Sequence, residues 1–337
     1  MRDETGRWIE GPELDWQNLP ARVEAIIAER IAKLSPASRR ILEVASVEGE
    51  EFTAEAVARV EGADEAEIIR RLSGELGKRH RLVEARTLQR LDGRRLSRYR
   101  FRHYLFQRYL YTHLDQVERA HLHEAMGEAL ETLYGESVAE VALPLARHFE
   151  EAGLMDQATD YLLQAGQRAA RLTAYEEAVT HFRRGLGLLG SLPEGPERAG
   201  KELSYRVGLG NSLGATKGAW HGFTDSEVRH TFARAEELGR QTGDVPLLYP
   251  EAWGLWLQDA ISHSGYDDSD LTKELLCLAQ STENPLLSLL GHSAMARNLL
   301  RRGELLQALE HFDRAFAYYD REQHAFLAYH CGFDRGM

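Results

Sequence analysis

Cysteine is scarce in this chain of 337 residues, which contains only Cys277 and Cys331. Two cysteines are too few for a disulfide framework or a cysteine-rich zinc site. Long apolar runs are also missing, since no segment approaches the roughly 18–20 apolar residues that cross a membrane. The first residues, MRDETGRW, are charged and lack the apolar stretch of a secretory signal. We therefore expect a cytoplasmic protein without a membrane partner.

Negative charge dominates the sequence, whose formal net charge is −12. The fractions of apolar and charged residues, 43% and 28%, are ordinary for a globular protein. Between Arg70 and Leu110, however, thirteen Arg or Lys residues stand against three acidic residues, a local balance of +10. The rest of the chain therefore carries −22. Such asymmetry indicates two different functional surfaces.

One segment imitates a phosphate-binding loop. Residues 195–201, GPERAGK, match the G-x4-G-K part of that motif. The mechanism needs a Ser or Thr next to hold magnesium and a buried strand before the loop. Here Glu202 follows the lysine, and its carboxylate would repel phosphates. We therefore expect no nucleotide hydrolysis by this chain.

The fourteen histidines do not form a recognisable metal or catalytic motif. His121 and His123 lie two apart on a predicted helix, hence on different faces, and no HExxH sequence occurs. His324, His330 and Cys331 have no further ligands at zinc spacing. We therefore expect histidines at the surface or between helices, no metal, no catalytic residue set and no enzymatic activity.

The first third of the chain predicts helices followed by a hairpin. An amphipathic helix, ARVEAIIAERIAKL, follows Pro20. Two segments with strand character, LVEA and LSRYRFRH, flank an Asp-Gly turn signal at residues 92–93. Three short helices before a two-stranded wing indicate a winged helix over residues 35–114. The N-caps of these three helices are predicted at Ser35, Thr53 and Asp64.

Strand signals end near Asp115, and a helical pattern recurs from there to the end. A turn residue is followed by Ala five positions on, an apolar residue four later and a small residue three after that. This is the second-helix half of the tetratricopeptide pattern. It predicts an α-solenoid of tetratricopeptide-like helical hairpins over residues 115–337. The copies are Gly153, Ala158, Leu162 and Ala165; Thr173, Ala178, Phe182 and Gly185; Gly303, Ala308, Phe312 and Ala315; and, in part, Val228, Phe232 and Ala235.

The basic segment has one inward and one outward face if it is a strand. In RYRFRHY, period two places Arg98, Arg100 and Arg102 on a solvated or phosphate-facing side. It places His103 inward, at the junction between the strand and the next helix. From periodicity alone, a core histidine bonded to a carbonyl is the simpler interpretation.

Three segments in this order resemble the region behind the nucleotide-binding module of bacterial STAND signal-transduction ATPases. They are LPARVEAIIAERIAKLSPASRRILEVASVEGEEFTAEAVARV, RYRFRHYLFQRYLY and LARHFEEAGLMDQATDYLLQAGQRAA. In that family a P-loop ATPase core precedes a winged helix and tetratricopeptide repeats. Many members carry a DNA-binding transcriptional-activator domain or a nucleotide cyclase.

The resemblance implies a role for one residue and for the chain as a whole. His103 matches the winged-helix histidine that contacts the β-phosphate of bound ADP, although Tyr104 stands where the commoner form has Asp. Residues 1–34 correspond to the tail of the ATPase module, and the repeat array is cut short at its C-terminal end. The chain would be a regulatory fragment without cofactor, whose intact parent binds ATP or ADP.

The implied partners are the missing ATPase module and a protein or peptide bound to the repeat array. The alternative is a winged-helix transcriptional regulator that binds DNA, which the local charge of +10 motivates. The predicted reading helix, however, begins with Asp64, Glu65 and Glu67, which would repel phosphates. Direct nucleic-acid binding is therefore the less favoured hypothesis.

Overall fold

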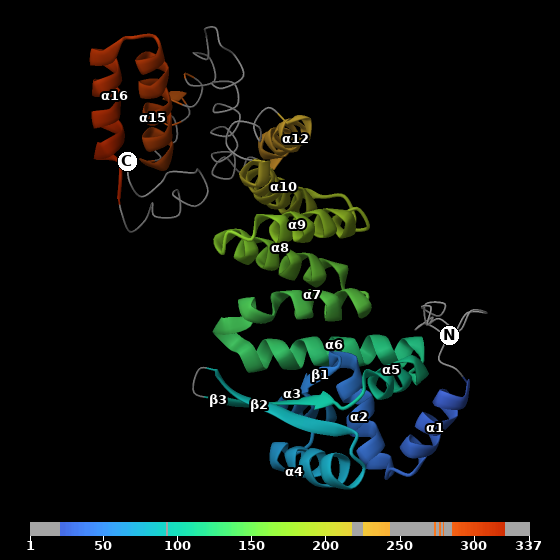
Figure 1. Ribbon diagram of the computed structural model, residues 1–337. Coiled ribbons are helices and arrows are strands. Elements are labelled where there is room, and N and C mark those ends of the chain that lie inside the picture. The colour runs from blue at the N-terminus through green and yellow to red at the C-terminus, as the bar shows by residue number, and fades with distance from the viewer. Residues whose placement is uncertain are drawn as a thin grey trace, which may run out of the picture. The chain divides into compact units, whose positions relative to one another are not determined.

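The computed structural model describes residues 21–91, 94–217, 225–242, 273, 276–277, 279 and 285–320. It divides into two compact units (Figure 1). The first ends at Val141 and also includes Arg147–Leu154, whereas the second comprises Ala142–Ala146 and the chain from Met155 onward. The described part is mainly helical and contains a small three-stranded antiparallel sheet, which lies in the first unit.

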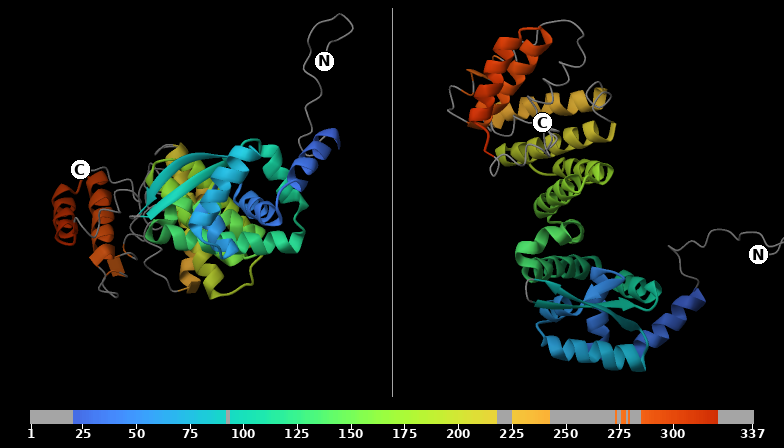
Figure 2. Two further views of the ribbon diagram at one scale, coloured as in Figure 1. Left: turned by 90° about the horizontal axis from the view of Figure 1, so that it is seen from below. Right: turned by 60° about the vertical axis from the view of Figure 1, so that its left-hand side comes forward.

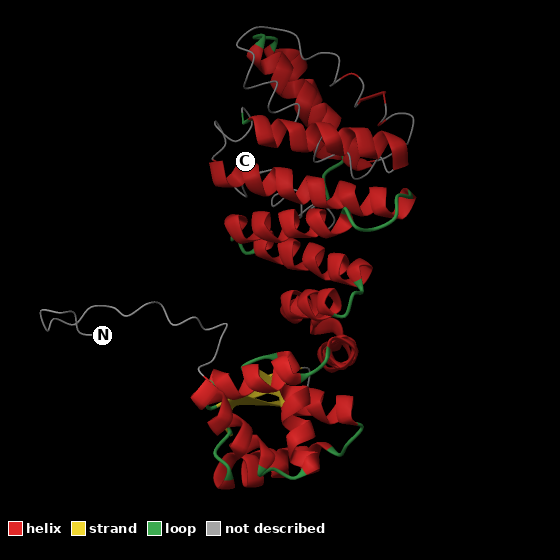
Figure 3. Cartoon of the chain, turned by 90° about the vertical axis from the view of Figure 1, so that its right-hand side faces the viewer, coloured by secondary structure: helices red, strands yellow, loops and turns green. Residues whose placement is uncertain are grey.

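The first unit alternates short helices with strands before it becomes helical. Strands, drawn in yellow in Figure 3, occur only here within the described residues. The elements are α1 (Ala21–Ala32), α2 (Pro36–Glu48), β1 (Glu51–Thr53), α3 (Ala54–Glu61), α4 (Glu65–Arg71), the π-helical segment η1 (Leu72–Arg79), β2 (Val83–Leu91), β3 (Arg94–Phe101), α5 (Tyr104–His113), α6 (Gln116–Tyr134), the 3₁₀ segment η2 (Gly135–Val141) and α7 (Ala142–Glu151).

Local sequence signals fix where several of these helices begin. The Ser35 hydroxyl accepts a bond from the Ser38 amide at 3.2 Å, and Pro36 occupies the first turn of α2. The Asp64 carboxylate caps α4 through the Glu67 amide at 3.0 Å. Thr53 precedes α3 as predicted, but its hydroxyl makes no capping bond and donates to Glu48 instead.

The sheet has the order β1-β3-β2, and both pairings are antiparallel. The predicted hairpin is formed by β2 and β3, which run side by side (Figure 2). The strand β1 was not predicted, because three residues are too short to reveal a period of two. It places Phe52 opposite Tyr99 in the register. The Phe52 ring also lies 5.3 Å from that of Phe101, and all three side chains are buried.

The first unit extends beyond the predicted domain boundary at residue 114. Helix α6 belongs to it, since its buried face packs against α2 and α3. The sequence does not indicate this packing, because an apolar helix face does not reveal which neighbour it will cover. Helix α1, predicted as part of a separate tail, packs against α5 and buries Ile27 and Ile31. Residues 1–20 lie outside the described part.

The second unit contains helices that pack as neighbours in the sequence. Contacts join α8 to α9, α9 to α10, α10 to α12, and α15 to α16. Buried side chains of α8, α9, α10 and α12 form a shared apolar interior. The bounds are α8 (Met155–Arg171), α9 (Tyr175–Leu189), α10 (Pro196–Lys217), α12 (Ser226–Thr242), α15 (Pro285–Arg301) and α16 (Leu305–Ala317).

The residues of the recurring pattern occupy similar environments. Gly153, Thr173 and Gly303, the three turn residues, all have positive φ, at 80°, 61° and 79°. Positive φ is costly for a β-branched residue such as threonine, so the turn geometry is imposed by packing. Phe312 is half-buried. The remaining pattern residues are buried: Ala158, Leu162, Ala165, Ala178, Phe182, Gly185, Ala308, Ala315, Val228, Phe232 and Ala235.

Glycines allow aromatic rings to enter the helix crossings of the second unit. A Cβ atom on Gly185 would lie 2.1 Å from the Tyr205 ring. Tyr205 is fully buried, and its hydroxyl donates to the Thr159 carbonyl. The ring therefore has no room to withdraw. A Cβ atom on Gly187, two residues further along the same helix, would have no neighbouring atom within 4 Å.

These two glycines provide a matched test of the packing. Gly185→Ala should lower the free energy of unfolding by about 1–3 kcal/mol, because the new methyl group overpacks the crossing with Tyr205. Gly187→Ala should raise it by up to about 1 kcal/mol, because alanine favours the helix. Urea denaturation of both variants measures the difference. Equal effects would show that Gly185 does not lie at a tight crossing.

Candidate functional site

The basic segment forms β3, a two-residue bend and α5. The predicted alternation holds along the strand, because Tyr99 and Phe101 are buried while Arg98 and Arg100 lie on the other side. Strand structure ends at Phe101. The period of two therefore applies to the side chains up to Phe101 and not to those that follow.

Arg98 bonds to a buried carboxylate and is not free to face a phosphate. Its Nη1 atom donates to Glu48 Oε1 at 2.9 Å and to Thr53 Oγ1 at 2.8 Å. The Thr53 amide and hydroxyl each donate to the same carboxylate at 2.8 Å. Only 7% of the Glu48 side chain is exposed. Burial raises the pKa of the Glu48 carboxyl, whereas the bonds to Thr53 and Arg98 act in the opposite direction.

The predicted arginine stripe is mostly neutralised within the unit. Arg100 forms an ion pair with Glu84 on the adjacent strand at 2.9 Å. Arg102 is exposed, and its Nε atom lies 3.4 Å from the Val83 carbonyl oxygen. The prediction of a solvated or phosphate-facing row was wrong for Arg98 and Arg100. The prediction failed because a period of two along a strand does not reveal carboxylate partners that lie 50 residues (Arg98) and 16 residues (Arg100) away.

His103 is exposed, which corrects the inward orientation predicted from alternation. The strand has already ended two residues earlier, so the period of two no longer applies. His103 is the N-cap residue of α5, but its side chain does not bond to the first amides of that helix. Its ring lies 6.2 Å from that of Phe106. A surface imidazole at this junction is free to contact a further group.

Helix α1 covers the neighbouring surface through one arginine. The Arg30 guanidinium lies 4.8 Å from the centre of the Phe106 ring, a cation–π contact, and donates to the His80 carbonyl at 2.6 Å. His103, at the N-cap of α5, and Arg30, on α1, therefore both lie near the Phe106 ring.

Two histidines that the sequence analysis does not bring together form a buried pair. His123 of α6 and His148 of α7 face each other with 2.9 Å between their Nδ1 atoms. Both are almost fully buried, whereas His121, two residues before His123, is exposed. The Tyr111 hydroxyl lies 3.0 Å from His123 Nε2. The spacing of His121 and His123 indicated different faces, but not the partner 25 residues away.

The pair is held in its neutral form. Burial, together with the cations of Arg147 and Arg119, lowers the pKa of His123 to about 4. Burial, His123 and Arg147 lower the pKa of His148 well below its ordinary value. Neutral imidazoles share a proton between facing nitrogens, which two imidazolium ions do not.

Three consecutive residues fix α7 on the first unit. Arg147 donates to the carbonyls of Val47 and Glu48 at 3.0 and 2.7 Å, at the C-terminal end of α2. His148 bonds to His123. The Phe149 ring lies so close to Gly127 of α6 that a Cβ atom there would approach it to 2.9 Å. An ion–dipole contact, a hydrogen bond and a tight packing contact thus act side by side.

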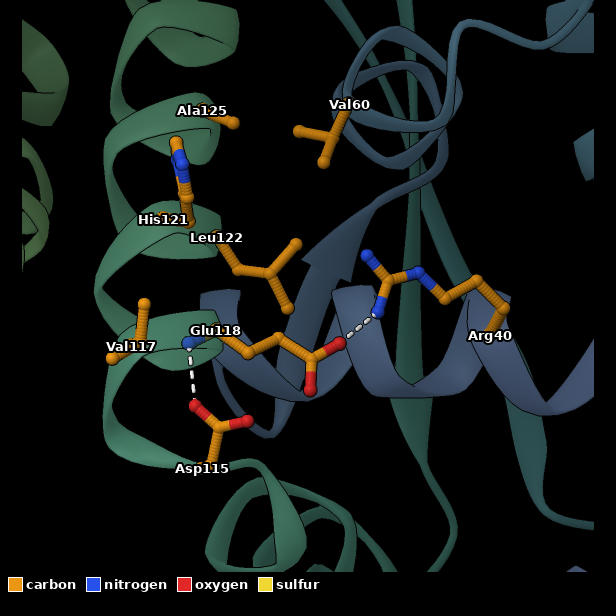
Figure 4. A pocket seen from close by; sticks show the side chains of 8 residues that line it. All are labelled: Arg40, Val60, Asp115, Val117, Glu118, His121, Leu122 and Ala125. Atoms are coloured by element: carbon orange, nitrogen blue, oxygen red, sulfur yellow. Dashed lines mark hydrogen bonds and ion pairs between the residues drawn. The ribbon is translucent and has the colours of Figure 1, made fainter.

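A shallow open pocket lies where α2 and α3 meet the start of α6 (Figure 4). Val60, Leu122 and Ala125 supply apolar surface. At its edge the Arg40 guanidinium bonds to the Glu118 carboxylate, and Asp115 caps the Glu118 amide at 2.9 Å. Because Arg40 also pairs with Glu61 at 3.2 Å, its charge is already satisfied. The pocket offers contact area but no reactive group.

Other motifs have ordinary structural roles within the described residues. Lys201, the lysine of the apparent phosphate loop, lies on α10 and pairs with Asp156 and Asp160 at 2.7 Å each. No cluster of three or more metal-binding side chains exists in the described ranges. The group formed by His324, His330 and Cys331 lies outside them. No described helix has the length and apolar character needed to span a membrane.

The chain matches no protein-family model, and no solved structure matches it. A similar sequence occurs in an uncharacterized protein of Rhizobium meliloti (strain 1021), which is 26% identical over 244 residues. The match covers 69% of this chain but 22% of the relative. The chain thus spans about a fifth of the length of the protein that it matches.

The internal pairing of the arginines predicts weak contact with nucleic acid. At physiological salt the chain should bind random duplex DNA no more tightly than a Kd of about 10⁻⁶–10⁻⁴ M. Arg95→Ala, at an exposed residue, should reduce the salt dependence by about one phosphate contact, whereas Arg100→Gln should leave it unchanged. Fluorescence anisotropy over a salt series measures both. A complex with one sequence that survives competitor DNA would contradict this prediction.

Proposed function

We propose that the chain is the regulatory portion of a STAND-type signalling ATPase and is not itself an enzyme. In this proposal the first unit is a winged helix that clamps ATP or ADP together with the ATPase module of the intact parent. The second unit is a tetratricopeptide-like array that binds a protein or peptide. The observation that carries the proposal is the exposed His103 at the strand-to-helix junction of the first unit.

The order of elements in the first unit supports the winged-helix assignment. Helix α2, strand β1, helices α3 and α4 and the hairpin β2–β3 follow one another, and β1 pairs with β3. A winged helix has this succession, with a short first strand at the edge of the wing. The order of elements in this region is therefore compatible with the winged helix that the resemblance implies.

The surroundings of His103 support a contact with a phosphate. The exposed imidazole directly follows the exposed Arg102, and the Arg30 guanidinium of α1 packs on Phe106, whose ring lies 6.2 Å from that of His103. Charge-assisted hydrogen bonds to phosphate are among the stronger polar interactions. The ATPase core would supply the rest of the nucleotide pocket, including the magnesium ligands.

The packing of the second unit supports the repeat assignment. Gly166 and Gly208 both admit the Phe182 ring, and Gly185 admits the Tyr205 ring, so neighbouring helices approach closely at small residues. Repeated helical hairpins with such crossings stack into arrays that offer an extended binding surface. An extended peptide or another protein is the class of partner that suits that surface.

The relative from Rhizobium meliloti supports a role within a larger protein. Its matching segment is a small part of a much longer chain. Signalling ATPases of this class combine an output domain, an ATPase core, a winged helix and repeats in one polypeptide. A sequence of the present kind is expected as the third and fourth parts of such a protein.

The alternative of a DNA-binding regulator has less support. The first turn of α4 carries Glu65 and Glu67 after the Asp64 cap, a poor surface for a phosphate backbone. Arg98 and Arg100 are paired with carboxylates. The remaining exposed arginines near the hairpin offer non-specific attraction but no base-reading helix.

The proposal is tested in the intact parent protein, encoded by this sequence with its upstream coding region. His103→Ala should weaken ADP retention by roughly 10–150-fold, because a charge-assisted phosphate contact contributes about 1.5–3 kcal/mol. It should also raise basal signalling activity. His121→Ala, at an exposed histidine on α6, is the matched control and should change neither. Equilibrium dialysis with labelled ADP measures the retention.

Two results would contradict the proposal. One is an upstream coding region without a G-x4-G-K-[ST] phosphate loop, since the clamp would then have no nucleotide to hold. The other is unchanged ADP retention in a folded His103→Ala protein. The isolated chain should lose little stability on the same replacement, because the His103 side chain is exposed.

A further inference from the structure

Three side chains form a hydrogen-bonded series in the interior of the first unit. Tyr111 of α5, His123 of α6 and His148 of α7 follow one another at 3.0 Å and 2.9 Å. If the tyrosine donates to His123 Nε2, then His123 donates from Nδ1 to His148. If His123 donates to the tyrosine, the second bond also reverses. In either pattern one facing Nδ1 atom must stay unprotonated as the acceptor, so the bond is lost when both facing atoms carry protons.

The series ends at an unsatisfied atom. Within the described residues, His148 Nε2 has no hydrogen-bond partner and is shielded from solvent. An unpaired buried polar group costs about as much as a lost hydrogen bond, which native interiors rarely tolerate without a reason. His148 would gain hydration at this atom as soon as its helix moved away from α6. The docked position of α7 therefore carries the free-energy cost of this unpaired atom, which the other contacts of α7 offset.

The charges around the pair make a further proton unfavourable while α7 is docked. Arg119 projects from α6 and Arg147 from α7, and both act on His123. The acidic group that acts in this surrounding is Glu151 of α7, whose influence reaches Tyr111. The positive charges thus outweigh the negative one. Proton uptake by the pair therefore weakens the docking of α7.

Helix α7 also occupies a special position in the chain. Its residues Ala142–Ala146 are part of the second unit, and from Arg147 onward it belongs to the first. The second half is the part that carries Arg147, His148 and Phe149. A change at the histidine pair therefore acts on the only helix that the two units share among the described elements.

We propose that His123 and His148 form a proton-operated latch, in which uptake of a proton by the pair releases residues 147–154 from α6. The direction follows from linkage. Both histidines have a lower pKa when docked than in water, where it is about 6.5. Docking is therefore fully favourable above that pH and is lost progressively as the pH falls below it. The latch goes beyond the proposed nucleotide clamp and does not depend on it.

Hydrogen exchange of the full chain at pH 7.0 and 5.5, corrected for intrinsic rates, tests the latch. Protection of a peptide covering 147–154 should fall by roughly 5–10-fold for each histidine that gains a proton. A peptide from α2, residues 36–48, is the internal reference. The same fall should occur in His121→Gln, whose replaced histidine is exposed on the same helix. In His148→Gln, which keeps a hydrogen-bonding group but cannot take up a proton at this position, the excess fall should shrink to the roughly 5–10-fold contribution of His123 alone.

The wild-type protein alone is sufficient to overturn the latch. Protection of residues 147–154 that follows the α2 reference from pH 7.0 to 5.5 would do so, even if His148→Gln failed to fold. An excess fall of the same size in a folded His148→Gln protein would also overturn it. Ring NMR provides an independent readout, since His123 and His148 should gain protons in step with the loss of protection. Protonation that leaves the protection intact would contradict the proposal.

Discussion

The buried carboxylate of Glu48 is the interaction on which the first unit depends. It stands at the C-terminal end of α2 and receives the Thr53 amide, the Thr53 hydroxyl and the Arg98 guanidinium. These bonds join α2 to β1 and β3. The backbone carbonyl of Glu48 accepts from Arg147, which joins α7 to the same point. A charge buried this deeply is tolerated because its hydrogen-bonding capacity is satisfied, and loss of any donor would leave it uncompensated.

This arrangement gives the arginines of the basic segment a structural role. Its arginines look like a nucleic-acid or phosphate surface in the sequence, yet Arg98 and Arg100 serve as internal counter-ions. The same segment leaves Arg102 and His103 exposed at its end. The sheet thereby holds the base of α5 rigidly and presents an imidazole at its start. In the second unit, aromatic rings such as Phe182 pack against glycines of neighbouring helices, and Tyr205 adds a buried hydrogen bond to Thr159.

Short-range features of the fold could be predicted from the sequence, whereas long-range pairings could not. The caps at Ser35 and Asp64 and the inward side chains of Tyr99 and Phe101 depend on neighbours a few residues away. The strand β1 was missed because three residues carry no period. His103 was assigned to the wrong face because the strand ends at Phe101. The His123–His148 pair joins residues on two helices and leaves no mark in either helix alone.

A double-mutant cycle on Glu48 and Arg98 tests the central claim most directly. Urea denaturation of Glu48→Gln, Arg98→Met and the double variant gives the coupling energy of the pair. A buried, fully bonded pair predicts a coupling of about 2–3 kcal/mol. The more exposed Arg100–Glu84 pair, treated in the same way, should give less than about 1 kcal/mol. Additive effects of the two changes at Glu48 and Arg98 would contradict the account, because Arg98 would then be available to an external phosphate.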